Sequence, residues 1–202
     1  MSQTLRERQR QMVRDEILDA AQLLVAQKGY VAVSMDELAA HVGISKPTLY
    51  SHFSTKEDLV TESVLRDIRR VLAKFEEAIH STQSPLQQLD MMLRSIINIQ
   101  IKTQTMNIHP WTPELMHMIR NHHDVCDYIL QMRDATARLV HAGMACGEID
   151  KNLDASTIIP VFYSLAMSLK FAHFHGAEVG EPQKATETIL TMFHRAVQPP
   201  QS

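Results

Sequence analysis

The stretch SMDELAAHVGISKPTLYSHF, residues 34–53, decides the fold of this chain. Apolar residues recur at helical spacing in residues 34–41 and again in residues 45–53, so each segment is predicted to form a short helix. The residues between them, Val42-Gly43-Ile44, fit a tight turn. Two short helices joined by a turn of about three or four residues that contains glycine form a helix-turn-helix.

Helix-start signals accompany both predicted helices. Ser34 and Glu37 have the capping-box form, in which the serine hydroxyl accepts a free backbone N–H and the glutamate reaches back to the serine N–H. Ser45 is placed to cap the second helix, and Pro47 lies in its first turn, where a missing N–H costs nothing. Thr55 is placed to cap the helix that follows. These signals support the helix boundaries that the apolar spacing predicts.

The outer face of the segment 45–53 carries polar chemistry. Leu49 and Phe53 are four residues apart and are expected to face inward together. The residues left outside are Lys46, Pro47, Thr48, Tyr50, Ser51 and His52. Most of these side chains have donors that suit phosphates and the edges of DNA bases. The alternative is that Lys46 is only solvated and that Tyr50 packs as a surface aromatic.

Helical spacing also dominates the rest of the chain, and period-2 alternation persists nowhere. The sequence therefore predicts an all-α protein of about nine helices. Caps and breakers place the helices at about residues 4–28, 34–41, 45–53, 55–80, 85–102, two between 113 and 146, 153–175 and 183–197.

Composition bounds the class of protein. The chain has 202 residues, of which 45% are hydrophobic and 21% charged, as in ordinary soluble proteins. No segment approaches the roughly 20 apolar residues of a membrane span, and the first residues lack the apolar stretch of a secretory signal. The two cysteines, Cys126 and Cys146, suggest no disulfide framework. We therefore expect a cytoplasmic protein with no membrane partner.

Residues 14–60 resemble the tetracycline-repressor (TetR) family of transcription regulators. The resemblance includes each turn and cap of this region. It is carried by ILDAA (17–21), KGY (28–30), SMDELA (34–39) and GISKPTLYSHFSTKEDL (43–59). It implies that residues 1–55 form a helix-turn-helix DNA-binding domain of three helices. It also implies that residues 56–202 form a helical domain for ligand binding and dimerisation.

The resemblance gives DNA-binding roles to individual positions. In a recognition helix the N-terminal residues reach the bases. The implied roles are helix capping with phosphate contact for Ser34 and Ser45, base contact for Lys46, Pro47 and Thr48, backbone contact for Tyr50 and His52, and phosphate contact for Lys56. Many family members have glycine where this chain has Pro47, so the preferred operator sequence is left open.

The chain's net charge of −3 does not indicate a nucleic-acid binder, so basicity must be local. Four arginines stand in the first fourteen residues against one acid, Glu7: they are Arg6, Arg8, Arg10 and Arg14. With the resemblance, the first three are expected to reach the minor groove or the flanking phosphates. The alternative is a solvated start of the first helix.

The resemblance implies a homodimer formed through the helices near 153–175 and 183–197. The alternative is that the first of these is the central helix of a monomer.

The resemblance also implies a pocket for an unknown small-molecule effector. Apolar and methionine-rich positions are the candidates for its lining, and core packing is the alternative for each of them. The candidates are Met92, Ile96, Met106, His109, Trp111, Met132 and Phe162.

His122, His123 and Cys126 form a cluster of soft ligands on one predicted helix, and a metal-sensing regulator is the interpretation it leaves open. The spacing of a recognised zinc site is missing, so we expect neither metal nor cofactor.

No P-loop, GxGxxG or GxSxG motif occurs, and we expect no enzyme. We predict a repressor that binds a palindromic double-stranded operator as a dimer and is released by a small molecule. An enzyme and a helical adaptor without DNA binding are the competing classes.

Overall fold

The computed structural model describes residues 4–102, 117, 123–174 and 180–200, and every regular element in these ranges is an α-helix. The expected all-α class is thus confirmed. The helices are α1 (Leu5–Lys28), α2 (Met35–Val42), α3 (Lys46–His52), α4 (Lys56–Ile79), α5 (Pro85–Lys102), α7 (His123–Cys146), α8 (Ala155–Phe174) and α9 (Pro182–Val197). The first of the two helices expected between 113 and 146 falls largely outside the described residues. None of the helices described is long and apolar enough to cross a membrane.

Local capping accounts for the start of the first four helices. The hydroxyls of Ser34, Ser45 and Thr55 accept the backbone N–H groups of Glu37, Thr48 and Asp58, as the sequence predicts. Thr4 forms a complete capping box with Glu7.

Two details of the turns refine the expectations from sequence. The capping box expected at Ser34 is only half formed, because the Glu37 carboxylate pairs with Lys28 on α1 instead of reaching back. Gly43 ends α2 in the left-handed conformation, with φ 76° and ψ 28°, a region that favours glycine. The turn between α2 and α3 therefore depends on a residue without a side chain.

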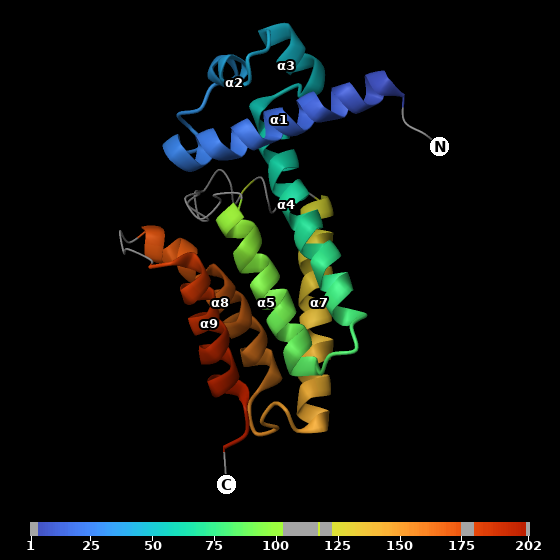
Figure 1. Ribbon diagram of the computed structural model, residues 1–202, viewed down its shortest axis with the longest axis vertical. Helices are drawn as coiled ribbons and strands as arrows, with labels where there is room; N and C mark the ends of the chain where they lie inside the picture. Colours follow the sequence, from blue (N-terminus) through green and yellow to red (C-terminus); the bar gives the residue numbers. More distant parts are fainter. Residues whose placement is uncertain (1–3, 103–116, 118–122, 175–179, 201–202) are drawn as a thin grey trace.

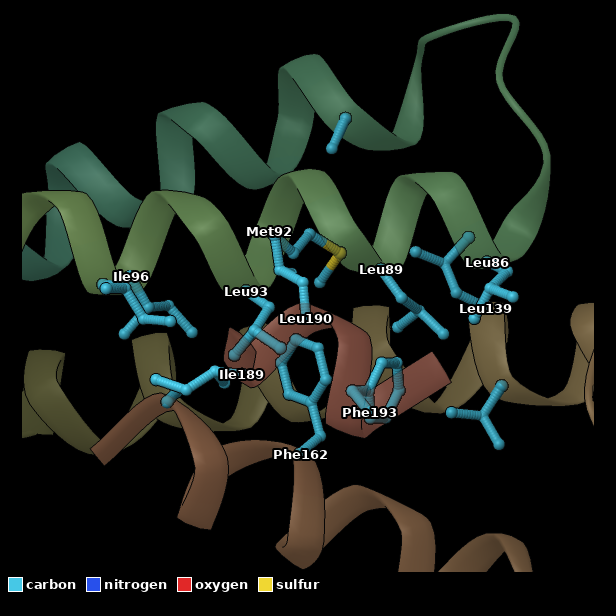
Figure 2. Packing of buried hydrophobic residues seen from close by; sticks show 14 of the residues in the cluster. Leu86, Leu89, Met92, Leu93, Ile96, Leu139, Phe162, Ile189, Leu190 and Phe193 are labelled. Atoms are coloured by element: carbon cyan, nitrogen blue, oxygen red, sulfur yellow. The ribbon is translucent and has the colours of Figure 1, made fainter. Parts of the chain in front are cut away.

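The buried apolar residues form two separate clusters. The first joins α1, α2 and α3 to the start of α4, and its largest fully buried members include Ile17, Leu38 and Leu49. The second joins the rest of α4 to α5, α7, α8 and α9. Figure 2 shows part of it, with Leu89, Met92 and Leu93 of α5 facing Phe162 of α8 and Phe193 of α9.

Helix α4 belongs to both clusters. Leu59 and Val60 pack in the first cluster, and Val71 and Phe75 pack in the second. Figure 1 shows α4 running from beneath α1 down to the long helices of the C-terminal part. The helix is therefore the continuous element between the two parts. The core of the N-terminal part reaches past residue 55, where the sequence places the domain division.

Candidate nucleic-acid interface

Helix α3 is anchored by its apolar residues and presents its polar residues outward. Leu49 is 0% exposed and Phe53, which directly follows the helix, is 3% exposed. They pack in the first cluster, as the sequence predicts. Because α3 is short and these two residues fix one face, the opposite face must lie outside. Figure 1 shows α2 and α3 at one end of the molecule, far from α9.

Two hydroxyls meet at the N-terminal end of α3. The Ser45 Oγ accepts the backbone N–H of Thr48 at 3.2 Å, and it lies 2.7 Å from the Thr48 Oγ1. The exposed Ser45 side chain is thus a cap, and its hydroxyl also fixes the orientation of the Thr48 hydroxyl. Pro47 lies beside them on the surface, where it adds an apolar contact surface and no donor.

Lys46 has an acidic neighbour on α2. Its ammonium nitrogen lies 2.6 Å from the Asp36 carboxylate, and both side chains are largely exposed. The hydrogen bond from Lys46 to Asp36 raises the pKa of the lysine, so the ammonium stays charged. A negative charge therefore stands directly beside the lysine that is expected to meet the bases.

Tyr50 and His52 differ in exposure. The Tyr50 side chain is 44% exposed, whereas His52 is half-buried. Burial lowers the pKa of His52 below its ordinary value of 6.5, and the positive charges of Arg10 and Arg14 lower it further. The imidazole is consequently neutral at pH 7 in the free protein.

Lys56 has partners inside the protein. Its ammonium donates to the carbonyl oxygens of Tyr30 and Val33, both at 2.9 Å, and lies 3.5 Å from that of Val31. The same ammonium stands 4.4 Å from the centre of the Tyr30 ring, in the position of a cation–π contact. Lys56 thereby ties the start of α4 to the loop between α1 and α2. Contact between Lys56 and a DNA phosphate stays a prediction. Two of the three ammonium N–H donors are used by Tyr30 and Val33, so a phosphate would take the donor that makes the long contact to Val31.

Arg14 also belongs to this surface, although no sequence motif assigns it an individual role. Its Nη1 donates to the His52 carbonyl at 3.1 Å, and its guanidinium lies 4.3 Å from the centre of the Phe53 ring. Arg6 and Arg10 precede it at four-residue spacing and therefore share its side of α1. That spacing is the signal in the sequence that points to Arg14 as part of the interface.

The first turns of α1 project from the domain. All residues from 4 to 12 are exposed, and Figure 1 shows this end of α1 extending beyond the other helices. The basic residues expected to form an arm, Arg6, Arg8 and Arg10, therefore stand on a helix that Thr4 caps.

The expected pocket residues fall into three groups. Met92, Ile96 and Phe162 are buried in the second cluster, with exposures of 0%, 3% and 0%. Met132 lies on α7 and lines a groove, whereas Met106, His109 and Trp111 lie outside the described residues. The structure thus brings three candidates together as core and places the fourth at a surface hollow.

The groove beside Met132 lies between α7 and α8 and has a volume of about 500 Å³. Its walls are almost wholly apolar. Burial raises the pKa of Tyr163, at its inner wall, to about 12, and the Tyr163 hydroxyl lies 2.9 Å from that of Thr136. The lining residues are Ile129, Met132, Arg133, Ser156, Ile159, Pro160 and Tyr163.

The expected soft-ligand cluster is only partly described, because His122 lies outside the described residues. His123 is exposed and its Nδ1 lies 3.1 Å from the Asp127 carboxylate, whereas Cys126 is half-buried. Within the ranges that the structure describes, no group of three or more His, Cys, Asp or Glu side chains is arranged to hold a metal ion.

Helix α8 presents apolar side chains to the surface. Val161 and Phe171 are 41% and 38% exposed, and residues 155–169 contain no charged side chain. On the neighbouring α9, Met192 is 55% exposed. These apolar side chains therefore lie exposed on two helices that contact each other.

The fold and this surface together define a helix-turn-helix DNA-binding protein. The family model "Bacterial regulatory proteins, tetR family" matches residues 17–62. The transcriptional regulator UidR of Escherichia coli is 30% identical over 135 residues, which cover 62% of this chain and 67% of UidR. The chain therefore belongs to the TetR family of transcription regulators, and it is not an enzyme.

Two further relatives agree in fold or in sequence. The structure of the ketosteroid transcriptional regulator KstR2 of Mycobacterium tuberculosis superposes with a TM-score of 0.74 at 19% identity and covers 93% of this chain and 95% of its own. The transcriptional activator FasR of Mycolicibacterium smegmatis is 36% identical over 76 residues, which cover 38% of this chain and 35% of FasR. The first likeness extends the shared fold to the C-terminal helices.

Proposed function

We propose that this chain is a repressor that binds a palindromic operator as a homodimer and leaves it when a small molecule binds. Residues 1–55 bind DNA in this proposal, residues 56–202 bind the effector and form the dimer, and α4 connects the two. The observation that carries the proposal is the outward polar face of α3, held by the buried Leu49 and Phe53. A short helix so placed suits insertion into a major groove.

Base reading is tested by selecting duplexes from a random 30-base-pair pool with the native protein. Thr48→Ala removes the hydroxyl that Ser45 orients, and it should change which duplexes are selected. Ser51→Ala is the matched control, because it also removes one exposed hydroxyl of α3, bonded there to the Thr48 carbonyl. An equal loss of affinity by Thr48→Ala on all duplexes would show that Thr48 does not read a base.

The dimer is supported by the uncharged outer face of α8. We propose that it packs with α9 against the same helices of a second copy, so that two α3 helices reach half-sites about 34–36 Å apart. Val161→Arg places a charge in this interface and should give a monomer in sedimentation velocity, with loss of binding to the selected duplex. Leu130→Arg, of similar exposure but on α7 and outside the groove between α7 and α8, is the control and should stay dimeric.

The effector is proposed to bind beside Met132, in the groove between α7 and α8. The lining favours an apolar molecule, because polar groups are few there. A library of apolar compounds would be screened for release of the selected duplex. Ile159→Trp fills the groove and should abolish that release while duplex binding is kept. Release that survives in Ile159→Trp would place the effector elsewhere.

A further inference from the structure

The groove between α7 and α8 has a proline in one of its walls. Pro160 lies inside α8 and lines the groove together with Ser156. In an α-helix each backbone N–H bonds to the carbonyl four residues earlier, and proline has no N–H. The carbonyl of Ser156 therefore lacks its helical partner. Both residues are exposed, so this acceptor lies near the surface, in the wall of the groove.

Tyr163 brings a second acceptor to the inner wall. The Thr136 hydroxyl donates to the Met132 carbonyl at 3.0 Å. Because a threonine hydroxyl has only one proton, the Tyr163 O–H must be the donor in its 2.9 Å contact with Thr136. Burial raises the pKa of Tyr163 to about 12, so the phenol keeps this proton at neutral pH. The Tyr163 oxygen is left with lone pairs and no proton to give.

The walls offer few hydrogen-bond donors in return. The Ser156 hydroxyl is used, because it donates to the Asp154 carboxylate. Among the described lining residues, only Arg133 keeps side-chain donors for a bound molecule. The Arg133 side chain is 59% exposed, and its guanidinium lies 3.6 Å from the Asp134 carboxylate. The donors of Arg133 therefore lie at the rim, in water, and the wall beside Pro160 presents an acceptor.

The charges near that acceptor disfavour an anion. Hydrogen bonds from Ser156 and Thr157 lower the pKa of Asp154, so a negative charge stands next to Ser156. A cation meets the opposite difficulty, because Arg133 itself lines the groove. Either ion would also lose water on entering walls that are almost wholly apolar, at a large cost in free energy. A neutral molecule with one donor avoids all three penalties.

We propose that the effector is a neutral, apolar hydroxyl compound, and that its O–H donates to the Ser156 carbonyl that Pro160 leaves free. Its hydrocarbon part lies against Met132 and Ile159. The Tyr163 oxygen gives the inner wall the same acceptor character. The proposal rests on the proposed function, since it names the class of molecule that the groove takes. The groove volume of about 500 Å³ is in the usual range for small-molecule sites.

Four naphthalenes of similar size test the hydrogen bond on the free protein. They are 2-naphthol, which has a donor, 2-methoxynaphthalene, which has none, the anion 2-naphthoate and the cation 2-naphthylmethylammonium. Calorimetric titration at pH 7 should show 2-naphthol binding about tenfold more tightly than 2-methoxynaphthalene, the ratio that one hydrogen bond supplies. Both ions should bind more weakly than 2-naphthol. No binding of 2-naphthol, or equal or tighter binding of any of the other three, overturns the proposal.

Pro160→Ala tests the origin of the acceptor. Alanine restores the N–H that bonds to the Ser156 carbonyl, and it favours helix. The preference for 2-naphthol over 2-methoxynaphthalene should fall to about twofold or less. The change in wall shape affects both probes, so their ratio reports on the hydrogen bond. A preference that persists in Pro160→Ala overturns the proposal.

Two serine variants are the matched controls for Pro160→Ala. Ser156→Ala keeps the backbone carbonyl and should keep the preference. Ser164→Ala removes a hydroxyl of α8 that donates to the Pro160 carbonyl at 2.8 Å and does not line the groove, and it should also keep the preference. Loss of the preference in Ser156→Ala would assign the recognition to the serine side chain and overturn the proposal.

The site of binding is checked by the methyl resonances of protein labelled with ¹³C-methyl methionine. Saturation with 2-naphthol should shift the resonance of Met132, and Ile159→Trp should abolish the shift. The failures of this proposal and of the proposed function are distinguishable. If 2-naphthol binds beside Met132 but releases no selected duplex, the proposed effector role fails and the hydroxyl site stands. If apolar compounds release the duplex with no preference for a hydroxyl, the hydroxyl site fails and the proposed function stands.

Discussion

The ammonium of Lys46 and the carboxylate of Asp36 lie 2.6 Å apart and join the first turns of the two helices of the helix-turn-helix. Asp36 is well placed for the N-terminus of α2, where a negative charge is favourable. It is poorly placed for DNA, since it lies on the surface proposed to face the phosphates and holds the lysine proposed to meet a base. We therefore expect the pair to stabilise the folded domain and to weaken its binding to DNA.

Asp36→Asn should strengthen binding to a selected duplex by about twofold to fivefold, because it removes a repulsive charge at the rim and frees Lys46. Filter binding at two salt concentrations checks this, and the gain should be smaller at high salt. Asp134→Asn on α7 removes an equally exposed charge far from α3 and serves as control. Weaker binding by Asp36→Asn would mean that the pair holds α3 in its binding position.

Protonation of His52 should be coupled to DNA binding. Its pKa is lowered in the free protein, chiefly by burial and further by Arg10 and Arg14. A phosphate beside the ring favours the charged form, so the pKa is higher in the complex than in the free protein. The complex therefore takes up a proton, and affinity should rise as the pH falls from about 7.5 to about 5.5.

Titrations of a selected duplex at several pH values measure this coupling. His52→Gln should flatten the pH dependence by up to one proton, whereas His41→Gln, at the exposed end of α2, should leave it as in the native protein. If His52→Gln has the same pH dependence as the native protein, His52 does not contact a DNA phosphate.

Lys56 should affect both stability and DNA binding. Lys56→Met keeps the stem but leaves the carbonyls of Tyr30 and Val33 without their donor, so the free energy of unfolding should fall by about 1–3 kcal/mol. If Lys56 also contacts a phosphate, the slope of log K against log salt becomes smaller by about one. Lys56→Arg keeps the charge, and its flat guanidinium does not reproduce the ammonium contacts.

Urea unfolding and salt titration separate the two roles of Lys56. We expect Lys56→Arg to be less stable than the native protein but to keep its salt slope. Lys56→Met should be less stable and should also have the smaller salt slope. A salt slope unchanged in Lys56→Met would leave this residue with the internal role alone.

The parts of the fold that were predictable from sequence depend on residues close together in the chain. The helix-turn-helix is predictable because each of its signals acts within one or two helical turns. These signals are the spacing of Leu49 and Phe53 and the caps Ser34, Ser45 and Thr55. The partners of Lys56 lie 26 and 23 residues earlier, and Arg14 reaches a carbonyl 38 residues away. Such contacts depend on how helices pack, which a local pattern does not contain.

The same limit explains the pocket. The spacing of Met92, Ile96 and Phe162 predicts that they face inward. The same spacing is found whether inward-facing residues line a pocket or fill a core, so it does not distinguish the two. In the structure all three are buried in the second cluster, and their part in lining a pocket stays a prediction. Glu37 shows the limit on a smaller scale, because its choice between Ser34 and Lys28 depends on where α1 lies.

Gly143 should be required for the packing of α7 against the loop that follows it. A Cβ built at this position would lie 2.7 Å from Cδ1 and 2.9 Å from Cγ1 of Ile149, a side chain only 1% exposed. Gly143→Ala should therefore lower the free energy of unfolding by about 1–3 kcal/mol through overpacking, although alanine favours helix. Urea unfolding checks this, and Ile149→Val, which removes the Cδ1 methyl, should restore part of the loss in the double variant. Gly143→Ala that is as stable as the native protein would mean that Ile149 moves aside freely.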